Sequence, residues 1–339
     1  MIKIYTNQTF LTEAFRKQVF PLLFDLVYVK NKKIEDYYCL VDVLEEADVI
    51  ISPIAYHKFI THKNEFRTLK ELAIKHSKPL FVYTAGDFGY TLKDTTVFNF
   101  RLGGFNSKLN KNTYILPSFI NDPYIVLNKE FGTVSRPEIP TIGFVGHAES
   151  GCKKYIKEFI AYLKLNIKQL INPGKNDYQS FYPSGYKRAK YLKQLEKTEG
   201  IITDFIFRNK YRAGVISKMQ KESTTYEFYD NMYNNAYTLC IRGVGNFSVR
   251  FYETLAMGRI PVVIDTDCRF PLESKIDWSK HVVLVKEFEI DHLESKILEF
   301  HNQFNLESFK SLQISNRNLW LNSLQRISYF KEISSIFTS

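Results

Sequence analysis

Hydrophobic residues in the first part of the chain gather in short runs that are separated by polar segments. The runs at residues 2–6, 48–52 and 79–84 are rich in β-branched and aromatic side chains and have the length of buried strands. Between the last two runs, residues 64–77 repeat apolar side chains at helical spacing. Strands that alternate with an amphipathic helix predict a parallel sheet of the Rossmann-like kind.

The same alternation starts again in the second part of the chain, after a polar segment that contains two prolines. The predicted strands there are 141–147, 200–207, 237–242 and 260–264, and the predicted helices are 153–165, 225–236 and 249–257. Two successive α/β units of similar size favour a ligand held in a cleft between domains.

We therefore predict an α/β protein of two Rossmann-like domains, each with a parallel sheet. The first domain spans residues 1–125 and the second spans 141–320, with 126–140 as the linker. Residues 321–339 are expected to form a C-terminal helix that can pack back on the first domain.

The size and composition of the chain agree with two globular domains. Its 339 residues exceed what one compact core usually supports, and 45% of them are hydrophobic. The four cysteines are widely spaced without a CxxC pair, which argues against a zinc framework and favours packed thiols in a reducing compartment. Because no secretory leader and no long apolar run is present, we expect a cytoplasmic protein, and peripheral association with a membrane surface stays open.

The net charge of +10 favours anionic partners, such as nucleotides, acidic glycans, nucleic acid or a membrane surface. The basic residues are dispersed and alternate with apolar positions at helical spacing, as in 152–159 and 186–197, so we expect most of them on solvated helix faces. No homeodomain, zinc-finger or RNA-recognition signature accompanies them. We therefore expect no nucleic acid among the partners.

One stretch of the second half places charges directly before a buried segment. Arg250 and Glu253 lie three residues apart near the start of the predicted helix 249–257, and Ser248 is suited to its N-cap. A helix N-terminus that follows a glycine-containing loop and carries an arginine is suited to phosphate oxygens. A carboxylate one turn further along is suited to accept hydrogen bonds from sugar hydroxyls. The spacing is equally compatible with a simple helical ion pair.

The residues from Thr238 to Val285 resemble the signature region of the exostosin family of glycosyltransferases. The matching elements, in order, are Arg242 with Gly243, then Ser248, Arg250 and Glu253, then Gly258 to Val262, then Pro271 with Leu272, and finally Ile276 to Trp278. Two departures are Ile241, where many members have proline, and the order Pro-Leu in place of Leu-Pro. The resemblance covers residues 141–290 well and the first 125 residues poorly.

The resemblance implies a GT-B fold, in which two Rossmann-like domains face each other and the C-terminal domain binds a nucleotide-sugar donor. It implies an inverting hexosyl- or pentosyltransferase that works without a metal or other cofactor, with a UDP-sugar as donor and a glycan or lipid-linked glycan as acceptor. Glu253 would hold the donor ribose. The groups implied around the donor diphosphate are Ser248, Arg250, the backbone amides of Gly243, Gly245 and Asn246, and the positive charge of Arg242.

A general base that removes the proton from the acceptor hydroxyl is expected across the cleft, in the first domain. Asp87 is the first candidate, because it follows a predicted strand and lies between glycines that allow close approach of a ligand. Its surroundings faintly resemble a Gly-Asp-His segment of exostosin members, with Phe88 in place of the histidine; an Asx-turn is the alternative for Asp87. His147 and Glu149, after the strand 141–147, are the second candidates.

Three other interpretations fit parts of the sequence. The Asp-Thr-Asp sequence at 265–267 could bind a metal, but it follows the last strand of a helix-strand unit and coincides with an exostosin loop, so we reject that interpretation. A fucosyltransferase that uses GDP-fucose shares a helix with glutamate, but its usual Thr-Glu-Lys is absent here. A non-catalytic protein that binds sugar nucleotides or glycans remains the alternative from a different class.

Overall fold

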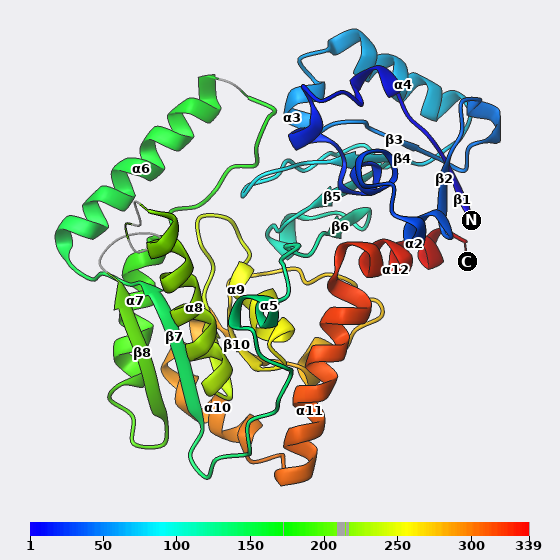
Figure 1. The fold of residues 1–339 in the computed structure, drawn as a ribbon. Coiled ribbons are helices and arrows are strands. Elements are labelled where there is room, and N and C mark those ends of the chain that lie inside the picture. Colours follow the sequence, from blue (N-terminus) through cyan, green and yellow to red (C-terminus); the bar gives the residue numbers. More distant parts are fainter. Residues whose placement is uncertain (172, 209–213, 215–216, 339) are drawn as a thin grey trace.

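The computed structural model describes residues 1–171, 173–208, 214 and 217–338. The chain forms two α/β domains, one above the other in Figure 1, and each is built on a parallel sheet. The predicted fold class, an α/β protein of two Rossmann-like domains that each contain a parallel sheet, is confirmed.

The first domain contains a six-stranded sheet in the order β2-β1-β3-β4-β5-β6, in which all described pairs are parallel. Its strands are β1 (Ile2–Tyr5), β2 (Tyr38–Leu40), β3 (Val49–Ile51), β4 (Leu80–Tyr83), β5 (Val97–Arg101) and β6 (Thr113–Ile115). Its helices are α1 (Pro21–Leu23), α2 (Lys32–Glu35), α3 (Tyr56–Phe59) and α4 (Lys63–Lys75). The strands predicted from their apolar runs are all present, because those runs are buried in this sheet.

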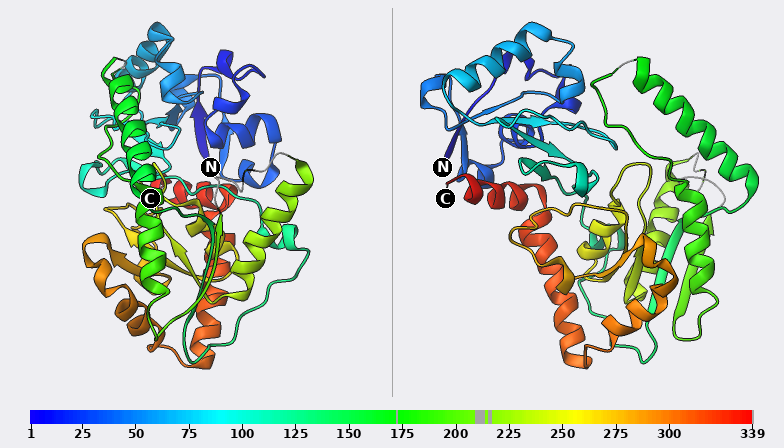
Figure 2. Two further views of the ribbon diagram at one scale, coloured as in Figure 1. Left: turned by 90° about the vertical axis from the view of Figure 1, so that its left-hand side faces the viewer. Right: turned by 180° about the vertical axis from the view of Figure 1, so that it is seen from behind.

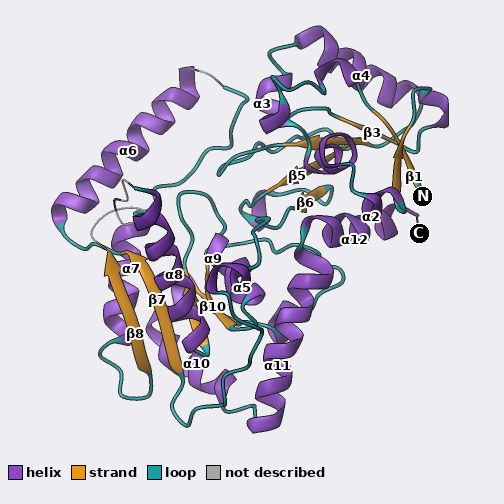
Figure 3. Cartoon of the chain, viewed as in Figure 1, coloured by secondary structure: helices purple, strands orange, loops and turns teal. Residues whose placement is uncertain are grey.

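The second domain contains a five-stranded parallel sheet in the order β11-β10-β9-β7-β8. Its strands are β7 (Thr141–His147), β8 (Ile202–Arg208), β9 (Tyr237–Cys240), β10 (Ile260–Asp265) and β11 (Val283–Lys286). Its helices are α6 (Cys152–Ile171), α7 (Ser184–Leu195), α8 (Lys218–Asn234), α9 (Val249–Ala256), α10 (Leu293–His301) and α11 (Leu306–Leu319). In Figure 3 the arrowheads of β7 and β8 point toward the end of the domain where α6 and α7 begin.

The chain passes between the two domains twice, once before the first strand of the second domain and once after its last helix. A short helix, α5 (Pro123–Leu127), and an irregular segment lead from the first sheet to β7. At the other end α12 (Arg326–Thr338) returns to the first domain, so the two termini lie close together (Figures 1 and 2).

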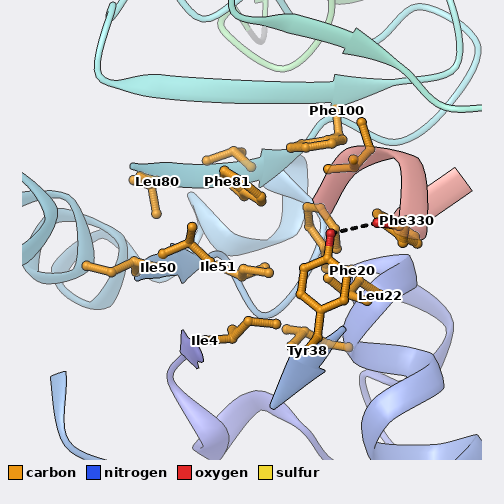
Figure 4. Close-up of a cluster of buried hydrophobic side chains, with 14 of the residues drawn as sticks. Ile4, Phe20, Leu22, Tyr38, Ile50, Ile51, Leu80, Phe81, Phe100 and Phe330 are labelled. Atoms are coloured by element: carbon orange, nitrogen blue, oxygen red, sulfur yellow. Dashed lines mark hydrogen bonds between the residues drawn. The ribbon is translucent and has the colours of Figure 1, made fainter. Parts of the chain in front are cut away.

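Helix α12 completes the hydrophobic core of the first domain. Tyr329, Phe330 and Ile333 are buried in the same cluster as the strand residues of β1, β3, β4 and β5 (Figure 4). The Tyr38 hydroxyl donates a hydrogen bond of 2.8 Å to the carbonyl oxygen of Phe330. The Arg326 guanidinium binds the buried carboxylate of Asp25 at 2.6 Å. The last residues of the chain therefore stabilise the domain formed by the first ones.

The loop after β10 ties the second domain to the first. Asp267, in the loop after β10, accepts hydrogen bonds from the backbone amide and hydroxyl of Ser107, at 3.2 and 2.5 Å. Arg269 donates to oxygen atoms of Asn106, Leu109 and Asn110 in the same first-domain loop and of Thr113 at the start of β6. These contacts fix the loop after β10 against the loops around β6.

A buried ion pair makes a further tie. The Arg101 guanidinium at the end of β5, 1% exposed, binds the carboxylate of Asp177 at 2.8 Å, in the segment between α6 and α7. Asp177 also accepts from the backbone amide and hydroxyl of Thr91, both at 2.7 Å. Arg101 donates as well to the carbonyl oxygen of Phe88, so this network also positions the loop that carries Asp87.

Among the described residues, no helix is long and apolar enough to cross a membrane.

The four cysteines differ in their exposure. The prediction of packed thiols is confirmed for Cys240, which is buried, while Cys39 and Cys268 are partly exposed. For Cys152, at the start of α6, the prediction is wrong, because this residue is exposed.

Candidate functional site

A cavity of about 750 Å³ lies between the two domains. The carboxyl ends of β7 and β8, the loop after β9 and the N-terminus of α9 form its wall in the second domain. Asp87, in the loop after β4, faces it from the first domain. Of the residues proposed from the sequence, the described lining contains Asp87, His147, Gly243, Gly245, Ser248, Arg250 and Glu253.

Arg250 lies on the first turn of α9 and extends across the end of β7. Its Nη2 donates a hydrogen bond of 2.7 Å to the carbonyl oxygen of Val145, and its guanidinium carbon lies 4.2 Å from the centre of the Phe144 ring. Within the described chain its Nε atom is buried without a hydrogen-bond partner. Burial, together with the nearby charges of Arg188 and Arg208, lowers the pKa of Arg250 to about 10. A bound anion would offset both effects, because it supplies the missing acceptor and the opposing charge.

A glycine on β7 makes room for this arginine. A Cβ atom at Gly146 would lie 3.0 Å from Nη2 of Arg250, so a larger residue there would push the guanidinium away from the strand. The glycine in the strand 141–147 is thus explained by the close approach of a side chain that is more than 100 positions later in the sequence.

Glu253 lies one turn further along α9 and is half-buried in the cavity wall. Its Oε1 accepts a hydrogen bond of 3.4 Å from the Tyr229 hydroxyl. Burial raises the pKa of the Glu253 carboxyl, and the Arg250 charge partly opposes this effect. Among the described ion pairs within 4.0 Å, none joins Arg250 to Glu253, so the alternative of a simple helical ion pair is wrong. Both residues line the same cavity.

Three further cationic residues line the cavity, and the sequence analysis did not select them. Lys154 comes from α6, Arg188 from α7 and Arg208 from the end of β8. Arg208 binds Glu227 at 2.6 Å, and Arg188 donates to the carbonyl oxygen of His147 at 2.9 Å.

Only the tertiary structure brings these three side chains together. Arg188 belongs to the basic run 186–197 that was expected on a solvated helix face, and for this residue the expectation is wrong. The available signal was its position one turn into a helix that starts with Ser184, because helix N-termini favour anions.

The glycines of the loop after β9 have two different environments. A Cβ atom at Gly243 would meet no heavy atom within 4 Å, so this position opens onto the cavity. A Cβ atom at Gly245 would lie 2.2 Å from the carbonyl oxygen of Asp87, so only glycine lets the two domains approach here. Ser248 occupies the N-cap position of α9, but its hydroxyl makes no capping hydrogen bond and faces the cavity.

Arg242 and Asn246 lie behind the cavity wall, at the contact between the domains. The Arg242 guanidinium is packed between the rings of Phe105 and Tyr182, with centroid distances of 5.2 and 4.5 Å. The Asn246 side-chain amide donates to the carbonyl oxygens of Gly104 at 3.1 Å and of Asp267 at 3.0 Å. Neither side chain is in the described lining of the cavity, so direct contact of these side chains with a ligand there is not supported.

The three candidates for the general base occupy different places. Asp87 is exposed and reaches the cavity from the first domain. His147 ends β7, and burial together with the charge of Lys154 lowers its pKa, so the neutral imidazole that can accept a proton is favoured. Glu149 is exposed outside the described lining, with its Oε2 3.6 Å from His147 Nε2, where it can orient the imidazole.

The two carboxylates of the Asp-Thr-Asp sequence at 265–267 accept hydrogen bonds that hold the loop after β10 in place. Asp265 Oδ1 accepts from the backbone amide of Cys268 at 2.7 Å, and the Asp267 carboxylate binds Ser107. No group of three or more potential metal ligands occurs among the described residues. Both carboxylates thus have structural partners, and neither lines the described cavity.

Comparisons with known proteins agree with the resemblance found in the sequence. The family model of the exostosin GT47 domain matches residues 181–299, a segment that contains β8 to β11 and α9. No curated protein matches the chain at a significant level.

The solved structures that are similar to this chain are distant. The structure of TarM is 12% identical with a TM-score of 0.36, and the match covers 86% of this chain and 55% of TarM. The GtfA/B complex is 10% identical with a TM-score of 0.35, and the match covers 86% of this chain and 57% of the solved one. The pneumococcal O-GlcNAc transferase GtfA, solved with UDP and GlcNAc, is 10% identical with a TM-score of 0.32 and has the same coverage. The chain therefore spans little more than half the length of these structures.

Proposed function

We propose that the chain is an inverting glycosyltransferase that moves a sugar from a nucleotide-sugar donor to a hydroxyl of a glycan or a lipid-linked glycan. The observation that carries the proposal is the interdomain cavity, into which α9 directs its N-terminus together with Arg250 and Glu253. Additional support comes from the exostosin GT47 match, which contains these residues. The donor proposed from the sequence is a UDP-sugar.

The second domain supplies the groups that would bind the donor. The diphosphate would lie at the N-terminus of α9, against Arg250, the Ser248 hydroxyl and the open backbone at Gly243, with Arg188 and Arg208 nearby. Glu253 would accept hydrogen bonds from the ribose hydroxyls. Arg242 would contribute only its positive charge near the diphosphate, without direct contact. Asn246 and Gly245 would contribute only their backbone, since the Asn246 side chain binds the first domain and Gly245 lies at the domain contact.

The reaction would join groups from both walls of the cavity. The acceptor oxygen attacks the anomeric carbon of the donor sugar and loses its proton to the base, while the bond from that carbon to the diphosphate breaks. The electron pair of this bond leaves with the nucleoside diphosphate, and the cations on the second-domain wall stabilise the charge that develops there. Asp87 is the proposed base, with His147, oriented by Glu149, as the second candidate.

Nucleotide binding can be tested directly by thermal unfolding of the full chain with UDP, GDP, CMP and their sugars. A nucleotide at 100 times its dissociation constant stabilises the folded state by about 2.7 kcal/mol, which is easily measured. We expect UDP to stabilise most and Glu253→Ala to abolish the effect, with the unfolding temperature of the free variant close to that of the wild type. If no nucleotide stabilises the protein, the donor site is wrong, and if GDP alone does, the fucosyltransferase alternative gains.

Release of nucleoside diphosphate from the stabilising sugar nucleotide distinguishes an enzyme from a binding protein. We expect slow release without acceptor, because water can replace the acceptor hydroxyl, and we expect it to persist in excess EDTA. Tight binding with no release, with or without glycan acceptors, would favour the non-catalytic alternative. Complete loss in EDTA that manganese restores would contradict the proposed metal independence.

A further inference from the structure

Helix α6 exposes a continuous row of large apolar side chains. It lies at the edge of the molecule in Figure 1 and in the right-hand view of Figure 2. The exposed fractions in this row range from 42% for Leu163 to 81% for Leu170. The row, called the α6 apolar stripe below, consists of Ile156, Ile160, Leu163, Ile167 and Leu170. Their spacing of four and three residues places all of them on one face of the helix.

Other faces of α6 attach the helix to the rest of the second domain. Phe181, in the segment before α7, packs against the rings of Tyr155 and Tyr162, with centroid distances of 5.3 Å in both cases. Lys154 and Glu158, on the side opposite the stripe, line the interdomain cavity. The stripe is therefore directed away from the contacts that hold the helix in place.

The charges on α6 are almost all positive. Each of Lys157, Lys164 and Lys168 follows a stripe residue by one position, so these ammonium groups lie along one border of the stripe. The helix carries the lysines 153, 154, 157, 164 and 168 and a single acidic residue, Glu158. An exposed apolar face bordered by lysines is the pattern of helices that lie in the interface of an anionic membrane.

We propose that the α6 apolar stripe docks the protein onto a bilayer surface that contains anionic lipids. The apolar side chains enter the boundary between headgroups and acyl chains, and the bordering lysines bind the lipid phosphates. A second copy of the chain fits less well, because two paired stripes would bring like-charged lysine borders together. The stripe also covers only about two heptads, which is short for a helical pair.

Docking in this way would place the cavity close to the lipid headgroups, because Lys154 and Glu158 join the two features across the width of one helix. An acceptor that is anchored in the bilayer would then reach the cavity without leaving the membrane. This consequence rests on the proposed function, whereas docking itself does not and can be tested without any donor or acceptor.

The test is co-sedimentation of the full chain with vesicles of phosphatidylcholine mixed with phosphatidylglycerol, and with vesicles of phosphatidylcholine alone. We expect the wild type to bind the anionic vesicles at least about tenfold more tightly than the neutral ones. The double variant Ile160→Ser/Ile167→Ser should lose at least about tenfold in binding to the anionic vesicles. The double variant Lys157→Glu/Lys164→Glu should lose most of the preference for anionic lipid.

The matched control is Ile125→Ser/Phe288→Ser, which removes two exposed apolar side chains outside α6, 77% and 81% exposed. It should bind vesicles like the wild type, and both serine variants should keep the unfolding temperature and the nucleotide response of the wild type. The proposal is overturned if the wild type stays in the supernatant with both vesicles, or if the control loses as much binding as the stripe variant. Sedimentation equilibrium that shows a dimer, dissociated by Ile160→Ser/Ile167→Ser, would assign the stripe to a second copy and also overturn the proposal.

Discussion

The residues of the exostosin-like signature divide between two regions that have different tasks. One group, on α9 and at Gly243, faces the cavity, and its arginine has a buried nitrogen without a described partner. The other group, formed by Arg242, Gly245 and Asn246, is in close contact with the first domain. The two groups alternate along the sequence within a single loop and helix.

The signature region thus contains residues of a domain contact as well as residues that line a cavity. The first domain borders the cavity at Asp87, and the second group holds the two domains in contact beside it. Substitutions in the first group should therefore change binding and turnover, whereas substitutions in the second should change stability first. The following predictions test this division.

The largest effect on activity is expected for Arg250→Ala. In the proposed reaction Arg250 stabilises the leaving diphosphate, so its removal should lower kcat/KM by roughly 10²–10³-fold, as loss of one preorganised donor typically does. Steady-state release of nucleoside diphosphate measures this effect. The matched control is Arg269→Ala, which removes an arginine from the domain contact. It should leave nucleotide affinity unchanged and lower the free energy of unfolding by about 1.5–3 kcal/mol; the reverse pattern would contradict the division.

Asp87 belongs to both regions, because its carbonyl oxygen touches Gly245 and its side chain faces the cavity. Asp87→Asn keeps the backbone contact and removes the proposed base, so turnover should fall by about 10²-fold while nucleotide affinity and unfolding temperature stay the same. Rapid-quench or steady-state kinetics with calorimetric titration separates the two quantities. If Asp87→Asn retains its turnover while His147→Ala loses it, the base lies in the second domain.

Two glycines in one loop give a direct comparison of stability. Gly245→Ala forces a Cβ atom against the Asp87 carbonyl oxygen, so the domains must shift, and we expect a loss of about 1–3 kcal/mol in the free energy of unfolding. Gly243→Ala meets no atom within 4 Å and should unfold like the wild type. Urea denaturation of both variants measures the difference. Equal stability of the two would mean that the loop does not hold the domains at this contact.

The smallest expected effect concerns pH and Glu253. Burial raises the pKa of this carboxyl above its ordinary value of 4.5, and the ionised form is the better acceptor for ribose hydroxyls. Nucleotide affinity should therefore rise as pH increases from 4.5 through the raised pKa, by about tenfold or less. Because burial disfavours the charged carboxylate, the protonated carboxyl is the form that favours the folded state. The free energy of unfolding therefore decreases as the pH rises from 4.5 through the raised pKa. Glu253→Gln should flatten the pH dependence of affinity measured by calorimetry; an unchanged slope would assign it to another group.

Local sequence pattern was sufficient for three strands of the first sheet, for four strands of the second and for the position of α9, whereas β2, β5, β6 and β11 were not predicted. The apolar runs that became β1, β3, β4, β7 and β10 are buried in their sheets, because continuous β-branched runs of this length are stable only when both faces are covered. The signature residues Arg250 and Glu253 were predicted on one side of a helix, and they do line one cavity. The side of a helix on which a residue lies can be predicted from the sequence, because it depends only on neighbours three to four residues away.

The tertiary structure alone decided which charges face the ligand space and which hold the domains together. Lys154, Arg188 and Arg208 come from three different elements and meet at one cavity, although each resembles an ordinary surface residue in the sequence. Arg242 and Asn246 belong to a loop whose sequence predicts phosphate binding, yet residues of the first domain cover both side chains. The physical reason is that burial of a polar side chain depends on segments more than 100 residues away, such as Gly104 beside Asn246, and no local pattern carries the position of such a partner.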